Sequence, residues 1–134
     1  MSLGTSKTIL KLFGFFDIIC GIFVIALAVM AFVGVSQTSP EELASDSSAG
    51  SAIVGMAIIF VLGLIALLEG IFSIRGAKDP SKIMPAWIFA IFGVITAAAG
   101  FFTGGSAGGS VSTLVINIVI FIAANKIRKS NAAK

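Results

Sequence analysis

The chain has no histidine, no tyrosine and only one cysteine among its 134 residues. Histidine and cysteine supply most zinc and haem ligands, so the usual ligand sets for these groups are excluded, and we expect no metal and no cofactor. Residues 104–108 match the G-x-S-x-G pattern of a nucleophile elbow, but that serine needs a histidine base, so the match reflects low complexity. There is no phosphate-binding loop and no dinucleotide fingerprint. The sequence therefore predicts a protein that is not an enzyme.

Charge is also scarce. Charged residues make up 11% of the chain and hydrophobic residues 57%, whereas a soluble domain has about 25% charged residues. A chain this short cannot hide so much apolar surface in one water-facing core, because small domains keep a large surface for their volume. Disorder needs the opposite composition. The mean hydropathy of +1.12 leaves one class, an integral membrane protein.

Long apolar runs are what the chain does have. There are four, at 12–35, 52–74, 83–102 and 111–127. A membrane helix needs about 17–25 residues and a barrel strand only about 9–11, so each run predicts a helix. The sequence predicts an all-α, four-helix transmembrane bundle with up-down-up-down topology and a single domain over 1–134.

The connections between the runs are short. Residues 36–51 form an acidic external loop in which Ser39, Pro40 and Glu42 resemble a capped helix start, so we expect a short helix there. Residues 76–82 form an inner loop with a second cap-and-proline pair, followed by Trp87 near the membrane interface. Residues 103–110 form an outer Gly/Ser loop.

The basic residues predict the orientation. They occur only in the N-terminal tail, the loop 76–82 with its flank, and the C-terminal tail: Lys7, Lys11, Arg75, Lys78, Lys82, Lys126, Arg128, Lys129 and Lys134. Short loops rich in Lys and Arg stay cytoplasmic, so we expect both termini on the cytoplasmic side of a cell membrane. The first run could instead be a cleaved signal peptide, but Asp17 interrupts it and apolar sequence continues to residue 35. We expect anionic lipid headgroups as partners at the cytoplasmic face, and no nucleic acid.

Small residues recur at seven-residue steps along each run, and such residues let membrane helices approach closely. The second run has Ala52, Ile59, Ala66 and Ser73 at this spacing, with Gly55, Leu62 and Glu69 beside them. The third run has Ala86, Gly93 and Gly100. The predicted packing positions are Gly14, Gly21, Ala28, Gly55, Ala66, Gly93 and Gly100.

Four polar residues lie within the runs or at their ends: Asp17, Glu69, Asn117 and Asn125. Ionised groups inside a membrane are costly and commonly functional. Asp17 and Glu69 lie at similar depths on small-residue faces, so they could face each other and share a proton or bind a cation. Alternatively, each is paired with a Lys, an Arg or Asn125 and fixes helix packing. We expect the two asparagines to bond between helices, with pore lining as the alternative.

The four short spans, and the ending from Ala123 to Lys129, resemble the small tetraspan integral membrane proteins of many bacteria, most of which are uncharacterised. The resemblance is one of layout, and it implies no catalytic residues. We expect a structural, accessory or immunity-type membrane subunit that forms a homo-oligomer or binds another membrane protein. The alternative is a small oligomeric transporter or channel, coupled to protons or cations through Asp17 and Glu69.

Overall fold

The apolar runs form helices, and three of these four helices continue beyond their runs. The computed structural model describes residues 1–37, 41, 49–103 and 107–133. Within these residues the chain forms α1 (Leu3–Ser36), α3 (Ala49–Lys78), the short 3₁₀ helix η1 (Pro80–Lys82), α4 (Met84–Phe102) and α5 (Ala107–Ala132). The described residues contain no strand, and the all-α prediction of four long helices is confirmed.

Each long helix contains a stretch that is long and apolar enough to cross a membrane. The chain is therefore a multi-pass membrane protein. The short helix expected in the loop 36–51 lies, apart from Glu41, outside the described residues, and so does most of the junction between α4 and α5.

Three of the four long helices are longer than the apolar runs that predicted them, whereas α4 is one residue shorter than its run. The helix α1 begins at Leu3 and not at residue 12, and α5 ends at Ala132 and not at residue 127. The added residues 3–11 at the start of α1 include hydroxyl side chains that bond to carbonyls one turn earlier: Ser6 Oγ donates to Ser2 O at 2.9 Å, and Thr8 Oγ1 donates to Gly4 O at 3.1 Å. Apolarity sets the length of a span, whereas a helix can continue into water, where water satisfies its terminal backbone groups.

The chain divides into two compact units, and α1 and α3 each contribute to both. The first, which we call the basic unit, comprises 1–16 and 69–134. It holds the start of α1, the end of α3, and all of η1, α4 and α5. The second, which we call the hairpin unit, comprises 17–68 and holds the remaining parts of α1 and α3.

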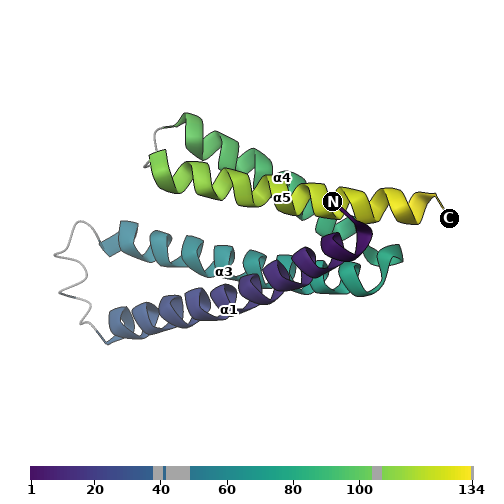
Figure 1. Cartoon of the computed structure of the whole chain (residues 1–134). Coiled ribbons are helices and arrows are strands. Elements are labelled where there is room, and N and C mark those ends of the chain that lie inside the picture. The colour runs from purple at the N-terminus through teal and green to yellow at the C-terminus, as the bar shows by residue number, and fades with distance from the viewer. Residues whose placement is uncertain (38–40, 42–48, 104–106, 134) are drawn as a thin grey trace. The chain divides into compact units, whose positions relative to one another are not determined.

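The core of the basic unit is built largely from alanine. In this unit α4 and α5 run side by side in opposite directions (Figure 1). Its buried residues are Leu10, Ala77, Ile83, Ala86, Ala90, Ile120, Ala123, Ala124 and Ile127. Because five of these nine residues are alanine, the backbones can approach closely, as small residues allow in membrane helices.

The turn that joins α3 to α4 is held by Asp79. Its Oδ1 accepts from the Ser81 Oγ at 2.6 Å and from the Ser81 N at 3.1 Å, and its Oδ2 lies 3.3 Å from the Lys82 Nζ. The hydrogen bond from the Ser81 side chain, followed by that from Lys82, holds the pKa of Asp79 below its ordinary value of 3.8. The sequence predicts that the third long helix starts at the Asp79–Pro80 pair, but Asp79 caps the short helix η1, and α4 begins only at Met84.

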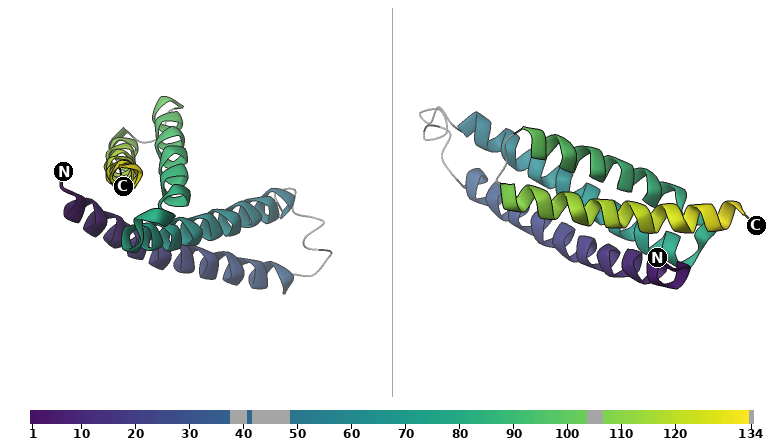
Figure 2. Two further views of the ribbon diagram at one scale, coloured as in Figure 1. Left: turned by 90° about the vertical axis from the view of Figure 1, so that its right-hand side faces the viewer. Right: turned by 45° about the horizontal axis from the view of Figure 1, so that its top comes forward.

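The hairpin unit is a pair of antiparallel helix segments, shown for α1 and α3 in Figure 2. Most of its large apolar side chains are exposed, among them Phe23 at 65%, Met30 at 69% and Leu62 at 56%. A soluble protein could not tolerate such a surface, but in lipid these side chains contact acyl chains.

Candidate functional site

Glycines bring α1 and α3 together. In the basic unit, a Cβ added at Gly14 would lie 2.8 Å from the Gly70 O and 2.7 Å from the Ile74 Cγ1. In the hairpin unit, a Cβ added at Gly21 would lie 2.9 Å from the Gly63 O. Each unit therefore contains one close glycine contact between α1 and α3. We call these contacts the glycine seam.

The α3 side of the glycine seam differs from the stripe expected from the sequence. The helix meets α1 through Gly63 and Gly70, with Leu67 between them, and not through Ala52 and Ile59, which are exposed. Gly63 and Gly70 have the same seven-residue spacing as Gly14 and Gly21. This matched spacing on two neighbouring helices is the signal that could have identified them.

Asp17 lies on the same face of α1 as the glycine seam. It follows Gly14 by three residues and precedes Gly21 by four, and residues three and four apart share a helix face. Its side chain is partly buried. Leu67 of α3, in the same hairpin unit, meets α1 at Gly21. A carboxylate therefore lies on a close-packed helix face inside the first span.

Glu69 lies off the stripe of α3 that meets α1. It precedes Gly70 by one residue, which is about 100° around a helix, and it shares its face with Phe72 and Ser73. The Phe72 ring stacks on Phe89 of α4 at 5.9 Å between centroids, and Ser73 is 3% exposed. Glu69 therefore lies toward the α4 side of the basic unit, whereas Asp17 belongs to the glycine seam of the hairpin unit.

The two asparagines have different surroundings. Asn117 packs its side-chain oxygen where a Cβ of Gly93 would be, so α5 and α4 approach closely at this point. Its Nδ2 donates to the Thr113 O at 2.8 Å, within α5. Asn125 accepts at its Oδ1 from the Arg128 Nη2 at 3.3 Å.

The remaining predicted packing positions divide into two groups. Ala28 is 5% exposed and Ala66 is partly buried. At Gly55 and Gly100, however, an added Cβ would meet nothing within 4 Å. The close approach expected at these two glycines therefore does not occur within the described part of the chain.

An aromatic and cationic cluster lies between α4 and α5. The Arg128 guanidinium carbon sits 4.3 Å from the centroid of the Trp87 ring. The Arg128 Nε and the Trp87 Nε1 are both buried, and neither has a hydrogen-bond partner in the described structure. The sequence placed Trp87 near an interface but gave no reason to pair it with Arg128, because the two are 41 positions apart.

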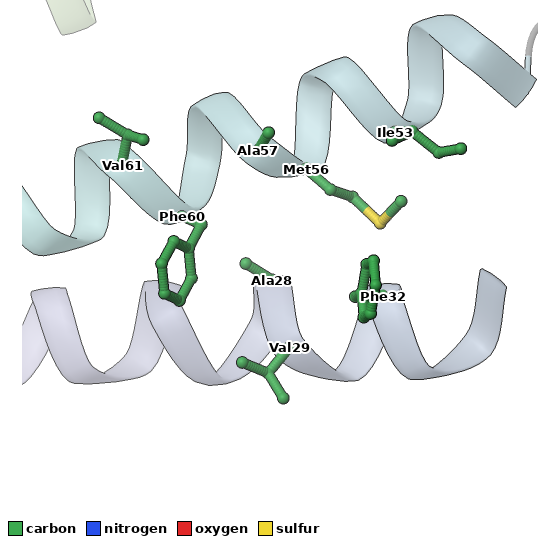
Figure 3. Close-up of a pocket in the computed structure, with 8 residues that line it drawn as sticks. All are labelled: Ala28, Val29, Phe32, Ile53, Met56, Ala57, Phe60 and Val61. Carbon is green, nitrogen blue, oxygen red and sulfur yellow. The ribbon is translucent and has the colours of Figure 1, made fainter. Parts of the chain in front are cut away.

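An apolar groove lies between the α1 and α3 segments of the hairpin unit. Its volume is about 350 Å³, and its lining is Ala28, Val29, Phe32, Ile53, Met56, Ala57, Phe60 and Val61. Figure 3 shows Phe32 of α1 and Phe60 of α3 in the space between the helices, with the Met56 side chain extending toward Phe32. All eight residues are apolar, so the groove suits a hydrocarbon surface.

Comparison of the chain with protein families, with curated proteins and with solved structures found no match.

Proposed function

We propose that the chain is a non-enzymatic membrane subunit of structural, accessory or immunity type. In this proposal the apolar groove of the hairpin unit receives a transmembrane helix of another membrane protein or of a second copy. The observation that carries the proposal is the groove itself, which lies within two spans and has only apolar lining.

The groove suits a helix because of the sizes of its side chains. Ala28 and Ala57 are small and lie on opposite sides of it, so an incoming backbone could approach closely. Met56 is flexible and fits irregular surfaces, and the two phenylalanines offer large contact areas. With side chains of this kind, van der Waals packing can drive helix association in lipid, where the hydrophobic effect is absent.

In the proposed orientation the protein lies in the plasma membrane, and both of its termini are in the cytoplasm. By sequence, the basic unit contains all nine Lys and Arg, whereas the hairpin unit has none and contains four of the six acidic residues. This asymmetry supports retention of the basic ends inside. A reporter that is active only in the cytoplasm, fused to the C-terminus, should be active, and its inactivity would overturn the orientation.

Photocrosslinking in native membranes tests the helix-docking proposal. A benzophenone amino acid replaces Phe60 in the groove or, as the control, Phe92 on the exposed surface of α4. We expect a discrete protein adduct from position 60 and only lipid adducts from position 92. An adduct of twice the chain mass identifies a second copy. Lipid adducts alone at position 60, or equal protein adducts at both, would contradict the proposal.

A proton- or cation-coupled transporter or channel is the second candidate. Its support is Asp17, which lies partly buried on the close-packed face of α1 and inside a span, where ionisable residues commonly mark transport pathways. In liposomes, this candidate predicts a flux that the double variant Asp17→Asn, Glu69→Gln abolishes while the protein remains folded. A flux that survives both neutralisations, or no flux at all from the unaltered chain, rules it out.

A further inference from the structure

The cluster between α4 and α5 combines a positive charge, a planar guanidinium group and hydrogen-bond donors that have no acceptor in the described structure. Arg128 stacks on Trp87 and donates from Nη2 to Asn125, so its guanidinium plane is oriented from two sides. The remaining buried N–H groups, Nε of Arg128 and Nε1 of Trp87, have no acceptor in the described structure. Arginine and tryptophan side-chain nitrogens can only donate, so both groups need an oxygen acceptor.

Unsatisfied buried donors are costly and uncommon, and an absent ligand is one of their ordinary explanations. The side chains of both residues are partly exposed as a whole, so the cluster reaches the surface of the basic unit. The acceptor must be small, rich in oxygen and present at a membrane interface.

The positive charge around the cluster favours an anion as the ligand. Lys126 and Lys129 flank Arg128 on α5 and are exposed. Of the two acidic residues in the basic unit, Asp79 is already paired with Lys82. Guanidinium groups bind phosphate oxygens through two parallel hydrogen bonds, and basic pockets between membrane helices bind lipid headgroups.

The position of the cluster along α4 and α5 favours a lipid as the source of this anion. Trp87 is the fourth residue of α4, and Arg128 directly follows the apolar run of α5. Tryptophan concentrates where hydrocarbon meets headgroups. We propose that Trp87, Asn125 and Arg128 form a binding site for the phosphate group of an anionic lipid. This goes beyond the general attraction of basic residues to anionic membranes, because it assigns the headgroup to one cluster.

The chain offers its own reporter, since Trp87 is its only tryptophan. Protein in nanodiscs of phosphatidylcholine is compared with protein in nanodiscs that also contain phosphatidylglycerol, and Trp87 emission is recorded. Native mass spectrometry in detergent gives the affinity for added phosphatidylglycerol. We expect a change in emission with phosphatidylglycerol, and no change when inorganic phosphate is added to the phosphatidylcholine discs. An equal response to inorganic phosphate would overturn the assignment to a lipid.

Two variants with the same charge change separate a site from general attraction. Arg128→Gln should weaken phosphatidylglycerol binding about tenfold, because the bidentate donor is lost. Lys129→Gln removes the same charge one residue away and should change it less than twofold. Equal losses in the two variants would mean that charge alone is responsible, and the proposal would fail.

Two further variants keep the arginine charge, so they remain informative if Arg128→Gln does not fold. Trp87→Phe keeps an aromatic ring under the guanidinium but removes the Nε1 donor. Asn125→Ala removes the acceptor that orients Arg128. We expect each to weaken phosphatidylglycerol binding about threefold by mass spectrometry. Unchanged binding in both would show that neither the donor nor the orientation of Arg128 contributes, which contradicts the proposal.

Discussion

The basic unit and the hairpin unit pack their helices in different ways. The basic unit buries a leucine of α1 together with alanines and isoleucines of α3, α4 and α5, and by sequence it contains all of the chain's cations. In the hairpin unit α1 and α3 meet closely where Gly21 contacts Gly63 and Leu67, and most of the large apolar side chains are exposed. Helix packing inside the chain therefore stabilises the first unit, whereas the second depends more on its surroundings, which are lipid or another helix.

The largest effect is expected at the glycine seam. In Gly21→Leu the new side chain would meet the Gly63 O, the Leu67 N and the Leu67 Cγ, each at 2.9 Å from the Cβ, and backbone atoms cannot move aside cheaply. We expect a loss of about 3 kcal/mol or more in unfolding free energy, at or above the usual range for overpacking. Thermal unfolding in detergent, followed by circular dichroism, measures it.

The control for this substitution is Gly55→Leu on α3, where an added Cβ meets nothing within 4 Å. Leucine favours helix over glycine by close to 1 kcal/mol, so this variant should be neutral or slightly stabilised. Equal destabilisation at both positions would mean that the close approach of α1 and α3 at Gly21 contributes nothing.

An alanine-to-leucine pair compares the two units directly. Ala90 is fully buried in the basic unit, whereas Ala57 is exposed in the groove of the hairpin unit. We expect Ala90→Leu to cost about 1–3 kcal/mol through overpacking, and Ala57→Leu to leave the stability of the isolated chain unchanged. In the crosslinking experiment at position 60, however, Ala57→Leu should reduce the protein adduct because it fills the groove.

The sequence predicts the helices well and their partners poorly. Run length and hydropathy identified all four spans, because a lipid environment demands long apolar helices. The start of α1 at Leu3 was missed, since polar residues such as Thr8 and Lys11 continue a helix outside lipid. The glycines of α3 that meet α1, Gly63 and Gly70, were missed because small residues occur on two faces of that helix. Only the structure distinguishes Gly63, which meets α1, from Gly55, where an added Cβ would meet nothing within 4 Å.

The candidate sites were predictable only as single residues. Asp17 and Glu69 were identified because charge is rare in a span, but which neighbours they meet depends on helix rotation, which spacing alone leaves open. The groove at Phe32 and Phe60 has no sequence signature, because apolar side chains inside lipid look alike whether they line a groove or face acyl chains. The pairing of Trp87 with Arg128 depends on how α4 and α5 pack together.

A smaller effect is expected where α4 meets α5. Because the Asn117 side chain occupies the space of a Cβ at Gly93, Gly93→Ala should cost about 1–2 kcal/mol. In an Asn117→Ala background the same change should cost almost nothing, since the space is then free. A double-mutant cycle of thermal unfolding measures this coupling. Additive effects of the two substitutions would show that the contact does not exist in the folded protein.

The smallest effect on stability is expected at the turn between α3 and α4 in the basic unit, where Asp79 is exposed to solvent. The Ser81 hydroxyl and Lys82 favour the ionised carboxylate, so its pKa is lower in the folded chain than the ordinary 3.8. The resulting stabilisation is fully present above pH 3.8 and is lost as the pH falls through the lowered pKa. Melting temperatures from pH 6 to pH 2 should show this loss in the unaltered chain, and less of it in Asp79→Asn, which cannot titrate. Salt should weaken the effect because an exposed ion pair is screened. Parallel pH profiles for the two proteins would mean that the cap does not stabilise the turn through its charge.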